Sequence, residues 1–184
     1  MQLHKAILII GQISSGKSTL ANRLFNELNM GKASFGGYLL HYCDQMGIAD
    51  RSRENLQAVG QQLIDAGPAS FLQAVIGFSA KGCKEVIFEG VRHLSILDEI
   101  QQISGDLISV YLDATFDQRL KRYLLRPDKA IDMDRSEAEF NKAISHPVEQ
   151  EVPSLRSKCA FVITSSDDPE MDYAALKAIL SQVS

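Results

Sequence analysis

The chain has 184 residues, a net charge of −4 and 45% hydrophobic residues, which suits one globular domain with a core of ordinary size. It has no basic tract and no apolar run of membrane-spanning length, and its cysteines, Cys43, Cys83 and Cys159, are isolated. These features argue against a nucleic-acid partner, a membrane span and a zinc site, and they favour a reducing compartment. We therefore expect one cytoplasmic domain over residues 1–184, and its oligomeric state stays open.

The first predicted strand, Ala6–Ile10, leads directly into a glycine-containing loop. Residues 11–18 read G-x-x-x-x-G-K-S, and leucines at positions 20, 24 and 28 follow at helical spacing. A strand, this loop and then a helix form the context that identifies a phosphate-binding P-loop. The alternative is a chance match in an ordinary strand-to-helix turn, and the flanking elements argue against it.

The residue types in this loop suit ATP and Mg²⁺. We expect Gly11 to turn the chain off the strand and Gly16 to let the backbone approach the phosphates. Lys17, exposed in the loop without nucleotide, would contact the β- and γ-phosphates, and Ser18 would be a Mg²⁺ ligand. Backbone amides from Ser14 to Thr19 would surround the phosphates at the positive end of the helix. The predicted ATP-binding residues here are Gly11, Ser14, Ser15, Gly16, Lys17, Ser18 and Thr19.

Helices fill most of the next segment. A very short strand at 33–34 precedes a helix that begins at Phe35 and ends near Gly47. Ser52 is the expected N-cap of a second helix over about 53–66, and a third helix follows Gly67-Pro68 to about residue 80. A simple crossover between parallel strands needs far fewer residues, so we expect the excess to form a helical flap over the substrate, at about 34–81.

The rest of the chain alternates strands with helices. Strands are predicted at 85–89, 107–112 and 160–163, with helices over about 94–104, 116–126, 137–145 and 169–182. The alternation predicts an α/β fold: a P-loop NTPase three-layer fold with a central parallel sheet of about five strands and helices on both faces. Ligands should then bind at the carboxyl ends of the strands.

The second clear strand ends in Glu89-Gly90-Val91-Arg92. Glu89 is placed to hold Mg²⁺, through water, opposite Ser18. Gly90 would allow close approach of a substrate, and Arg92 would clamp an acceptor phosphate, because guanidinium binds phosphate in a bidentate manner. The alternatives are a strand that simply ends in an acid and an arginine that is merely solvated.

Three arginines share one face of the helix over 116–126: Arg119, Arg122 and Arg126. A solvated basic face is the ordinary explanation. The position after a strand end favours a role for Arg122 and Arg126 on the transferred phosphoryl group. The polar segment after Pro127 predicts an exposed loop that would close over the site as a lid, at about 127–136.

Together these motifs resemble the small P-loop kinases of the nucleoside monophosphate kinase type, with dephospho-CoA kinases as relatives. Residues 11–19 match their ATP loop, and residues 34–40 are similar to the S/T-x-G-D-x-L-R segment that begins their monophosphate flap. Gly37 replaces the acid of that segment, and His41 stands about where an arginine is expected. The resemblance implies that Arg122 packs on adenine, that Arg126 contacts phosphate and that the flap binds the acceptor, with Gly36 at its start and Arg53 in place of the arginine.

The sequence therefore predicts an ATP- and Mg²⁺-dependent phosphotransferase, with Lys17, Arg92 and Arg126 as catalytic residues. Its substrates would be nucleotides and small molecules, and the acceptor a small phosphorylated compound, in the first place a nucleoside monophosphate. Two alternatives remain open. One is a kinase for an alcohol, with Glu89 as the base, and the other is a non-catalytic ATP-binding regulatory protein.

Overall fold

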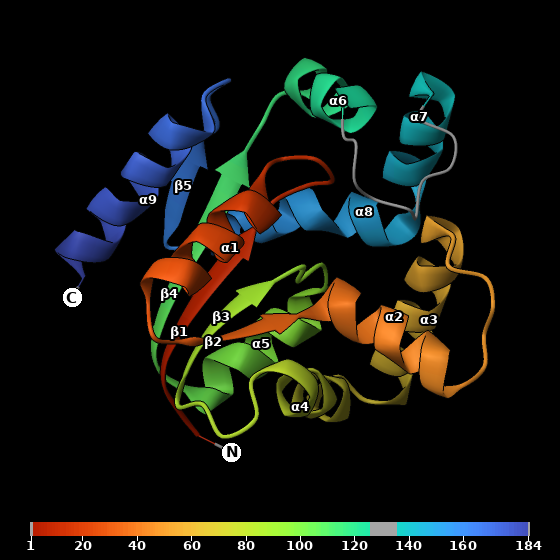
Figure 1. Ribbon diagram of the computed structural model, residues 1–184, viewed down its shortest axis with the longest axis horizontal. Helices are drawn as coiled ribbons and strands as arrows, with labels where there is room; N and C mark the ends of the chain where they lie inside the picture. The colour runs from red at the N-terminus through yellow and green to blue at the C-terminus, as the bar shows by residue number, and fades with distance from the viewer. Residues whose placement is uncertain (1, 126–135, 184) are drawn as a thin grey trace.

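The computed structural model describes residues 2–125 and 136–183. A five-stranded parallel sheet with the strand order β2-β3-β1-β4-β5 lies at the centre (Figure 1). The strands are β1 (Leu3–Ile10), β2 (Gly31–Ser34), β3 (Glu85–Glu89), β4 (Ser104–Asp113) and β5 (Phe161–Thr164). The predicted α/β three-layer fold with a parallel sheet of five strands is confirmed.

Nine α-helices and one 3₁₀ helix belong to the described part of the chain. They are α1 (Lys17–Glu27), α2 (Phe35–Gln45), α3 (Arg53–Ala66), α4 (Pro68–Ser79), α5 (Leu94–Ile103), α6 (Phe116–Leu125), α7 (Glu137–Ser145), α8 (Pro147–Glu151), the 3₁₀ helix η1 (Val152–Lys158) and α9 (Pro169–Gln182). Ser52 caps α3, since its hydroxyl accepts a hydrogen bond from the Asn55 amide, as the sequence predicts.

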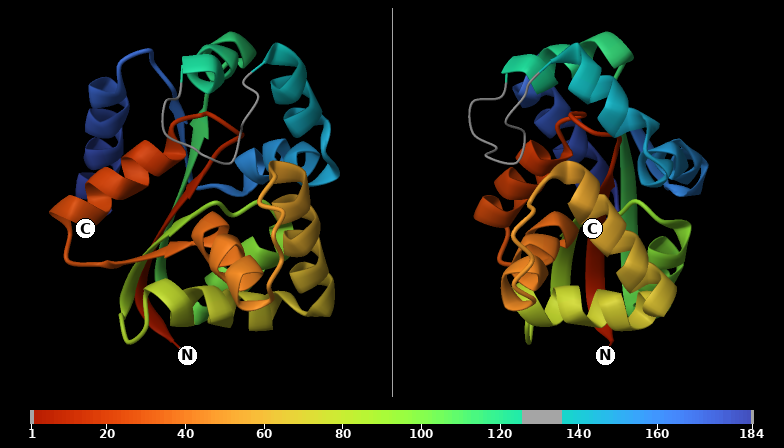
Figure 2. Two further views of the ribbon diagram at one scale, coloured as in Figure 1. Left: turned by 45° about the vertical axis from the view of Figure 1, so that its right-hand side comes forward. Right: turned by 90° about the vertical axis from the view of Figure 1, so that its right-hand side faces the viewer.

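Alternating residues of the strands face opposite layers of helices, because side chains along a strand point to opposite faces. On β1, Leu8 and Ile10 pack toward α4, α5 and η1, whereas Ile7 and Ile9 pack toward α1 and α9. The two views of Figure 2 show α1 and α9 side by side on their face of the sheet. The strands are therefore apolar on both faces, as a covered parallel sheet requires.

Two of the three helices between β2 and β3 extend away from the sheet, although Phe35 at the start of α2 belongs to the main core. Helices α2 and α3 pack on each other through a small cluster of their own, built from Cys43, Leu56 and Val59. Helix α4 instead packs on the sheet, where Leu72 and Val75 join the main core. The flap is therefore the α2–α3 pair, which lies on the right of Figure 1.

The observed element boundaries differ from the predicted ones mainly at the strands. Strand β2 begins at Gly31, where a side chain would collide with Cys83 and Ala80, and β4 begins at Ser104. None of the helices in residues 2–125 and 136–183 is long and apolar enough to cross a membrane. Arg126 and residues 127–135 of the predicted lid lie outside the described residues.

Candidate active site

The P-loop joins the carboxyl end of β1 to α1, and its two glycines are needed for different reasons. Gly16 has φ +104°, a left-handed conformation that glycine adopts at little cost. At Gly11, a Cβ would lie 2.5 Å from Ser15 Oγ and 2.8 Å from the Leu112 carbonyl oxygen. Gly16 therefore provides a turn, and Gly11 allows the loop to pack closely on its own neighbours, while the approach of Gly16 to phosphates stays a prediction.

Some polar groups of the loop are already engaged within it. The amides of Ser15 and Thr19 donate to the carbonyls of Gln12 (3.1 Å) and Gly16 (3.0 Å), so the expected ring of inward-pointing amides is wrong at these two positions. Lys17 is only 8% exposed, and its Nζ donates to the Gln12 carbonyl at 3.1 Å. The expectation that this lysine is exposed is also wrong, because the loop folds back over its side chain.

Two oxygen-bearing side chains predicted to hold Mg²⁺ meet in space. The Ser18 hydroxyl donates to Glu89 Oε1 at 2.8 Å, because α1 begins where the adjacent strand β3 ends. A hydroxyl and a carboxylate are hard oxygen ligands, and protein-bound Mg²⁺ usually has only one or two carboxylates, with water and phosphate as its other ligands. The Ser18–Glu89 pair therefore fits a Mg²⁺ that is shared with nucleotide phosphates, and the described residues contain no group of three or more His, Cys, Asp or Glu side chains that could hold a metal ion by themselves.

The hydroxyls of Ser14 and Ser15 are buried within this loop. Both residues are buried, at 2% and 0% exposure, and neither Oγ has a hydrogen-bond partner in residues 2–125 and 136–183. Ser14 also has φ +60°, which is unusual for a residue with a side chain. Buried polar groups without partners are rare in folded proteins and call for a physical explanation. For Ser14, which lines the cavity beside the loop, phosphate oxygens would supply a partner, whereas Ser15 Oγ lies against Gly11 and Ser15 does not line that cavity.

A cavity of about 460 Å³ adjoins the P-loop. It lies between the loop, the α2–α3 flap and the end of β3, so it collects side chains from segments far apart in the sequence. Its lining includes many of the predicted site residues, namely Ser14, Gly16, Lys17, Ser18, Gly36, Arg53, Glu89, Gly90 and Arg92. Most of its other walls are apolar, formed by Ile13, Phe35, Leu39, Leu40, Leu56, Phe71, Val91, Ile96 and Val148.

Arg92 faces this cavity beside a buried carboxylate that the sequence analysis missed. Its Nη1 lies 2.7 Å from Oε1 of Glu149, a residue of α8 whose side chain is 2% exposed. The two charges form an ion pair by distance, although the contact lacks the alignment of a hydrogen bond. Glu149 thus gives Arg92 a partner, and neither group is simply solvated.

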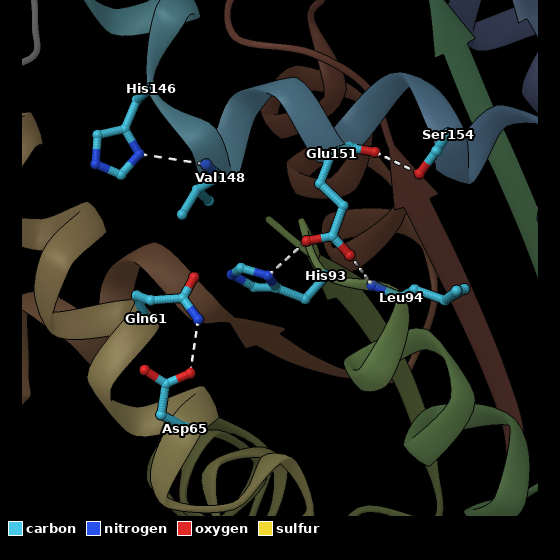
Figure 3. Close-up of polar contacts among 8 residues, drawn as sticks. All are labelled: Gln61, Asp65, His93, Leu94, His146, Val148, Glu151 and Ser154. Atoms are coloured by element: carbon cyan, nitrogen blue, oxygen red, sulfur yellow. Dashed lines mark hydrogen bonds and ion pairs between the residues drawn. The ribbon is translucent and has the colours of Figure 1, made fainter.

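The neighbouring residue, His93, also lines the cavity and is tied to α8 (Figure 3). Its Nδ1 lies 2.9 Å from Glu151 Oε2, and Glu151 Oε1 accepts a hydrogen bond of 2.8 Å from the Leu94 amide. One carboxylate therefore caps the first turn of α5 and orients the histidine. This contact holds α8 against the loop that follows β3.

Arg122 lies on the other side of the P-loop. Its Nη1 donates to the Ser15 carbonyl at 2.7 Å and to Ser165 Oγ at 3.0 Å, and its Nη2 donates to the Ser166 carbonyl. It therefore links the P-loop to the loop between β5 and α9 and does not line the cavity. Its predicted contact with ATP stays a prediction.

Arg119, one turn earlier on α6, is not part of a solvated basic face. It is 6% exposed, its guanidinium lies over the Phe140 ring, and burial lowers its pKa. Its Nε and Nη1 find no hydrogen-bond partner in the described residues. His41, which stands where an arginine is expected, stacks on Phe78 with ring centroids 4.4 Å apart and does not line the cavity.

The P-loop, the sheet order and the cavity at the carboxyl ends of the strands define a P-loop kinase fold. The AAA domain family matches the chain over residues 7–142, and the chain belongs to that family. Among curated proteins, no sequence match was found.

Solved structures share the fold across the whole chain. Shikimate kinase from Bacteroides thetaiotaomicron matches with a TM-score of 0.61 and 15% identity, covering 96% of this chain and 98% of that one. An unliganded sugar kinase from Janibacter sp. HTCC2649 matches with a TM-score of 0.62 and 13% identity, covering 97% and 95%. A kinase described as putative, from Chloroflexus aurantiacus J-10-fl, matches with a TM-score of 0.56 and 19% identity, covering 100% and 97%. At these identities the matches establish the fold, and they leave the acceptor undetermined.

Proposed function

We propose that the protein transfers the γ-phosphoryl group of ATP, with Mg²⁺, to a small phosphorylated acceptor held under the α2–α3 flap. A nucleoside monophosphate is the first candidate for that acceptor. The observation that carries the proposal is the continuity of the site: one cavity is lined by Lys17 and Ser18 of the P-loop, Glu89 at the end of β3 and Arg53 of the flap. A donor and an acceptor bound there would meet at the P-loop.

Phosphoryl transfer depends on position and on neutralisation of charge more than on covalent chemistry by the protein. Lys17 would hold the β- and γ-phosphates, and Mg²⁺, when bound at Ser18 and Glu89, would neutralise the charge that develops between them. Arg92 reaches the cavity from the end of β3, and Arg53 reaches it from α3, so the two guanidinium groups would orient the acceptor's anion. An acceptor phosphate is already ionised at neutral pH and needs no general base.

The test is steady-state turnover with MgATP and a panel of acceptors: AMP, CMP, GMP, UMP, thymidine monophosphate and shikimate. We expect ATP consumption that depends on one of the monophosphates, with loss of most of the rate in the Lys17→Ala variant. Turnover by Lys17→Ala at the wild-type rate would contradict the assignment. Binding of ATP by the wild-type protein without transfer to any acceptor would favour the non-catalytic regulatory alternative.

An alcohol acceptor is the second candidate, and the position of Glu89 favours it. The Glu89 carboxylate lines the cavity and accepts a hydrogen bond from a hydroxyl, that of Ser18, so it could accept the proton of a substrate hydroxyl as a general base. The shikimate kinase and sugar kinase that share the fold are named for alcohol substrates. Phosphorus NMR of the product separates the two candidates, because a phosphoanhydride and a phosphate monoester have distinct signals.

A further inference from the structure

Gln57 is a buried polar residue in the acceptor cavity that the function described above does not use. It lies on α3, is 4% exposed and lines the cavity. Its Nε2 has no hydrogen-bond partner in the part of the chain that the structure describes. A buried amide N–H without a partner costs about 1–3 kcal/mol of stability, and a hydrogen bond to a bound ligand would offset that cost.

The helix presents a regular face to the cavity. Arg53, Leu56, Gln57 and Gly60 all line it, and they are spaced three, four and seven residues from the first. Residues at this spacing share one face of a helix. Leu39 packs closely on Gly60 at the end of this row, where a Cβ would lie 3.3 Å from Leu39 Cδ1. Gln57 is therefore an uncharged polar group one turn beyond a cation, on an otherwise apolar surface.

We propose that Gln57 determines acceptor specificity by donating a hydrogen bond from Nε2 to an uncharged acceptor atom of the substrate, such as a carbonyl oxygen or a ring nitrogen. This inference rests on the proposed function. The anionic group of the substrate has Arg53 and Arg92 as partners, so a neutral donor is suited to another part of the same molecule. Gln57 lies one helical turn, about 5.4 Å along the helix axis, beyond Arg53, so one small molecule can contact both side chains.

The chemistry of the surrounding walls defines the rest of the substrate. Leu56, Phe71 and Val91 line the same cavity, and they would contact an apolar or aromatic body. The acceptor that fits is compact: it has one anionic group, an apolar or planar centre and a neutral hydrogen-bond acceptor about one helical turn from the anion. A site built around a hydrogen bond discriminates strongly against analogues that lack it, because the buried donor is then left unpaired.

The test compares Gln57→Met with the control variant Gln62→Met. Methionine is close to glutamine in length and suits a helix, and Gln62 is exposed on the same helix outside the cavity lining. We measure thermal unfolding without ligand and the kinetics with MgATP and the monophosphate that the wild-type protein turns over fastest. Gln57→Met should unfold at the same temperature as the wild type or higher, since it removes an unpaired buried donor.

The same variant should raise the KM of that monophosphate by about tenfold, while the KM of MgATP stays within about twofold. Gln62→Met should match the wild type in both measurements. Gln57→Glu keeps the shape but replaces the donor with a carboxylate, so it should also raise the KM of the monophosphate. It is the second variant, and it tests the donor without a change in the length of the side chain.

Two results would overturn the inference. A fall in the unfolding temperature of Gln57→Met by several degrees relative to Gln62→Met would make Gln57 a structural residue. An unchanged KM of the monophosphate in both Gln57 variants would show that the amide does not contact the acceptor. The wild-type protein is assayed first. If it phosphorylates none of the monophosphates, the proposed function fails and the inference fails with it, which distinguishes this outcome from the two results above.

Discussion

Replacing Arg92 should affect both stability and catalysis, because its guanidinium lies beside a buried carboxylate. In the variant Arg92→Met, Glu149 keeps its 2% exposure and loses its cationic partner. Leaving one member of a buried ion pair alone typically costs about 3–5 kcal/mol. Here we expect the lower part of that range or slightly less, since the Arg92 side chain is 24% exposed and the contact lacks hydrogen-bond alignment.

The expected loss in the free energy of unfolding is therefore about 2–3 kcal/mol. For a chain of this size, such a loss corresponds to roughly 4–12 °C in the midpoint of thermal unfolding. The double variant Arg92→Met/Glu149→Leu removes both charges and replaces them with apolar side chains. It should recover most of the stability, because replacing a buried ion pair with apolar residues is often neutral or stabilising.

Urea unfolding of the wild type, both single variants and the double variant gives the coupling energy between the two residues. Acceptor kinetics on the same proteins then separate the two roles of Arg92. The double variant should regain stability, yet its acceptor KM should stay high, because the guanidinium that would hold the acceptor's anion is still missing. A free energy of unfolding of Arg92→Met within about 0.5 kcal/mol of the wild-type value would refute the reasoning, since changes that small are typical of surface substitutions.

Three further predictions concern the donor side. Lys17→Ala should remove most phosphoryl transfer in a coupled assay. Its free energy of unfolding should change by no more than about 1 kcal/mol, the value of one hydrogen bond. An active variant would contradict the role given to this lysine. Gly11→Ala should lower the free energy of unfolding by about 1–3 kcal/mol, because the new Cβ collides with Ser15 and the Leu112 carbonyl. The same collision should weaken MgATP binding in calorimetry, and normal binding would show that the loop can shift freely. Arg122→Lys keeps the charge but loses the planar guanidinium that donates to both Ser15 and Ser165. The KM of ATP should therefore rise while the acceptor KM stays constant. The opposite pattern would place Arg122 on the acceptor side.

The fold was predictable from the sequence because its signals are local. An apolar strand, a P-loop and a helix with leucines on one face occupy consecutive residues, and each buried strand ends at a polar residue or glycine. The meeting of Ser18 with Glu89 was also predictable, since parallel strands place their carboxyl ends at one edge of the sheet.

The buried polar residues were not predictable, because their burial depends on contacts between distant elements. Arg119 reads as part of a solvated face until α7 places Phe140 against it. Glu149 reads as one acid among several in a short helix, and nothing near it in the sequence indicates Arg92 as its partner. Gln57 had a weak signal in its spacing from Arg53, but the same spacing describes an ordinary exposed face.

The separate packing of the α2–α3 pair has a consequence for how this fold diversifies. The pair leaves the sheet at Ser34 and returns at Gly67, and its buried cluster of Cys43, Leu56 and Val59 lies outside the cores on the two faces of the sheet, joined to the main core through neighbours such as Leu39 and Leu63. Substitutions along the cavity-facing side of α3 can therefore accumulate without disturbing the nucleotide loop. Residues 35–66 could therefore be exchanged between proteins of this fold. Such an exchange should change the acceptor preference and leave the P-loop unchanged.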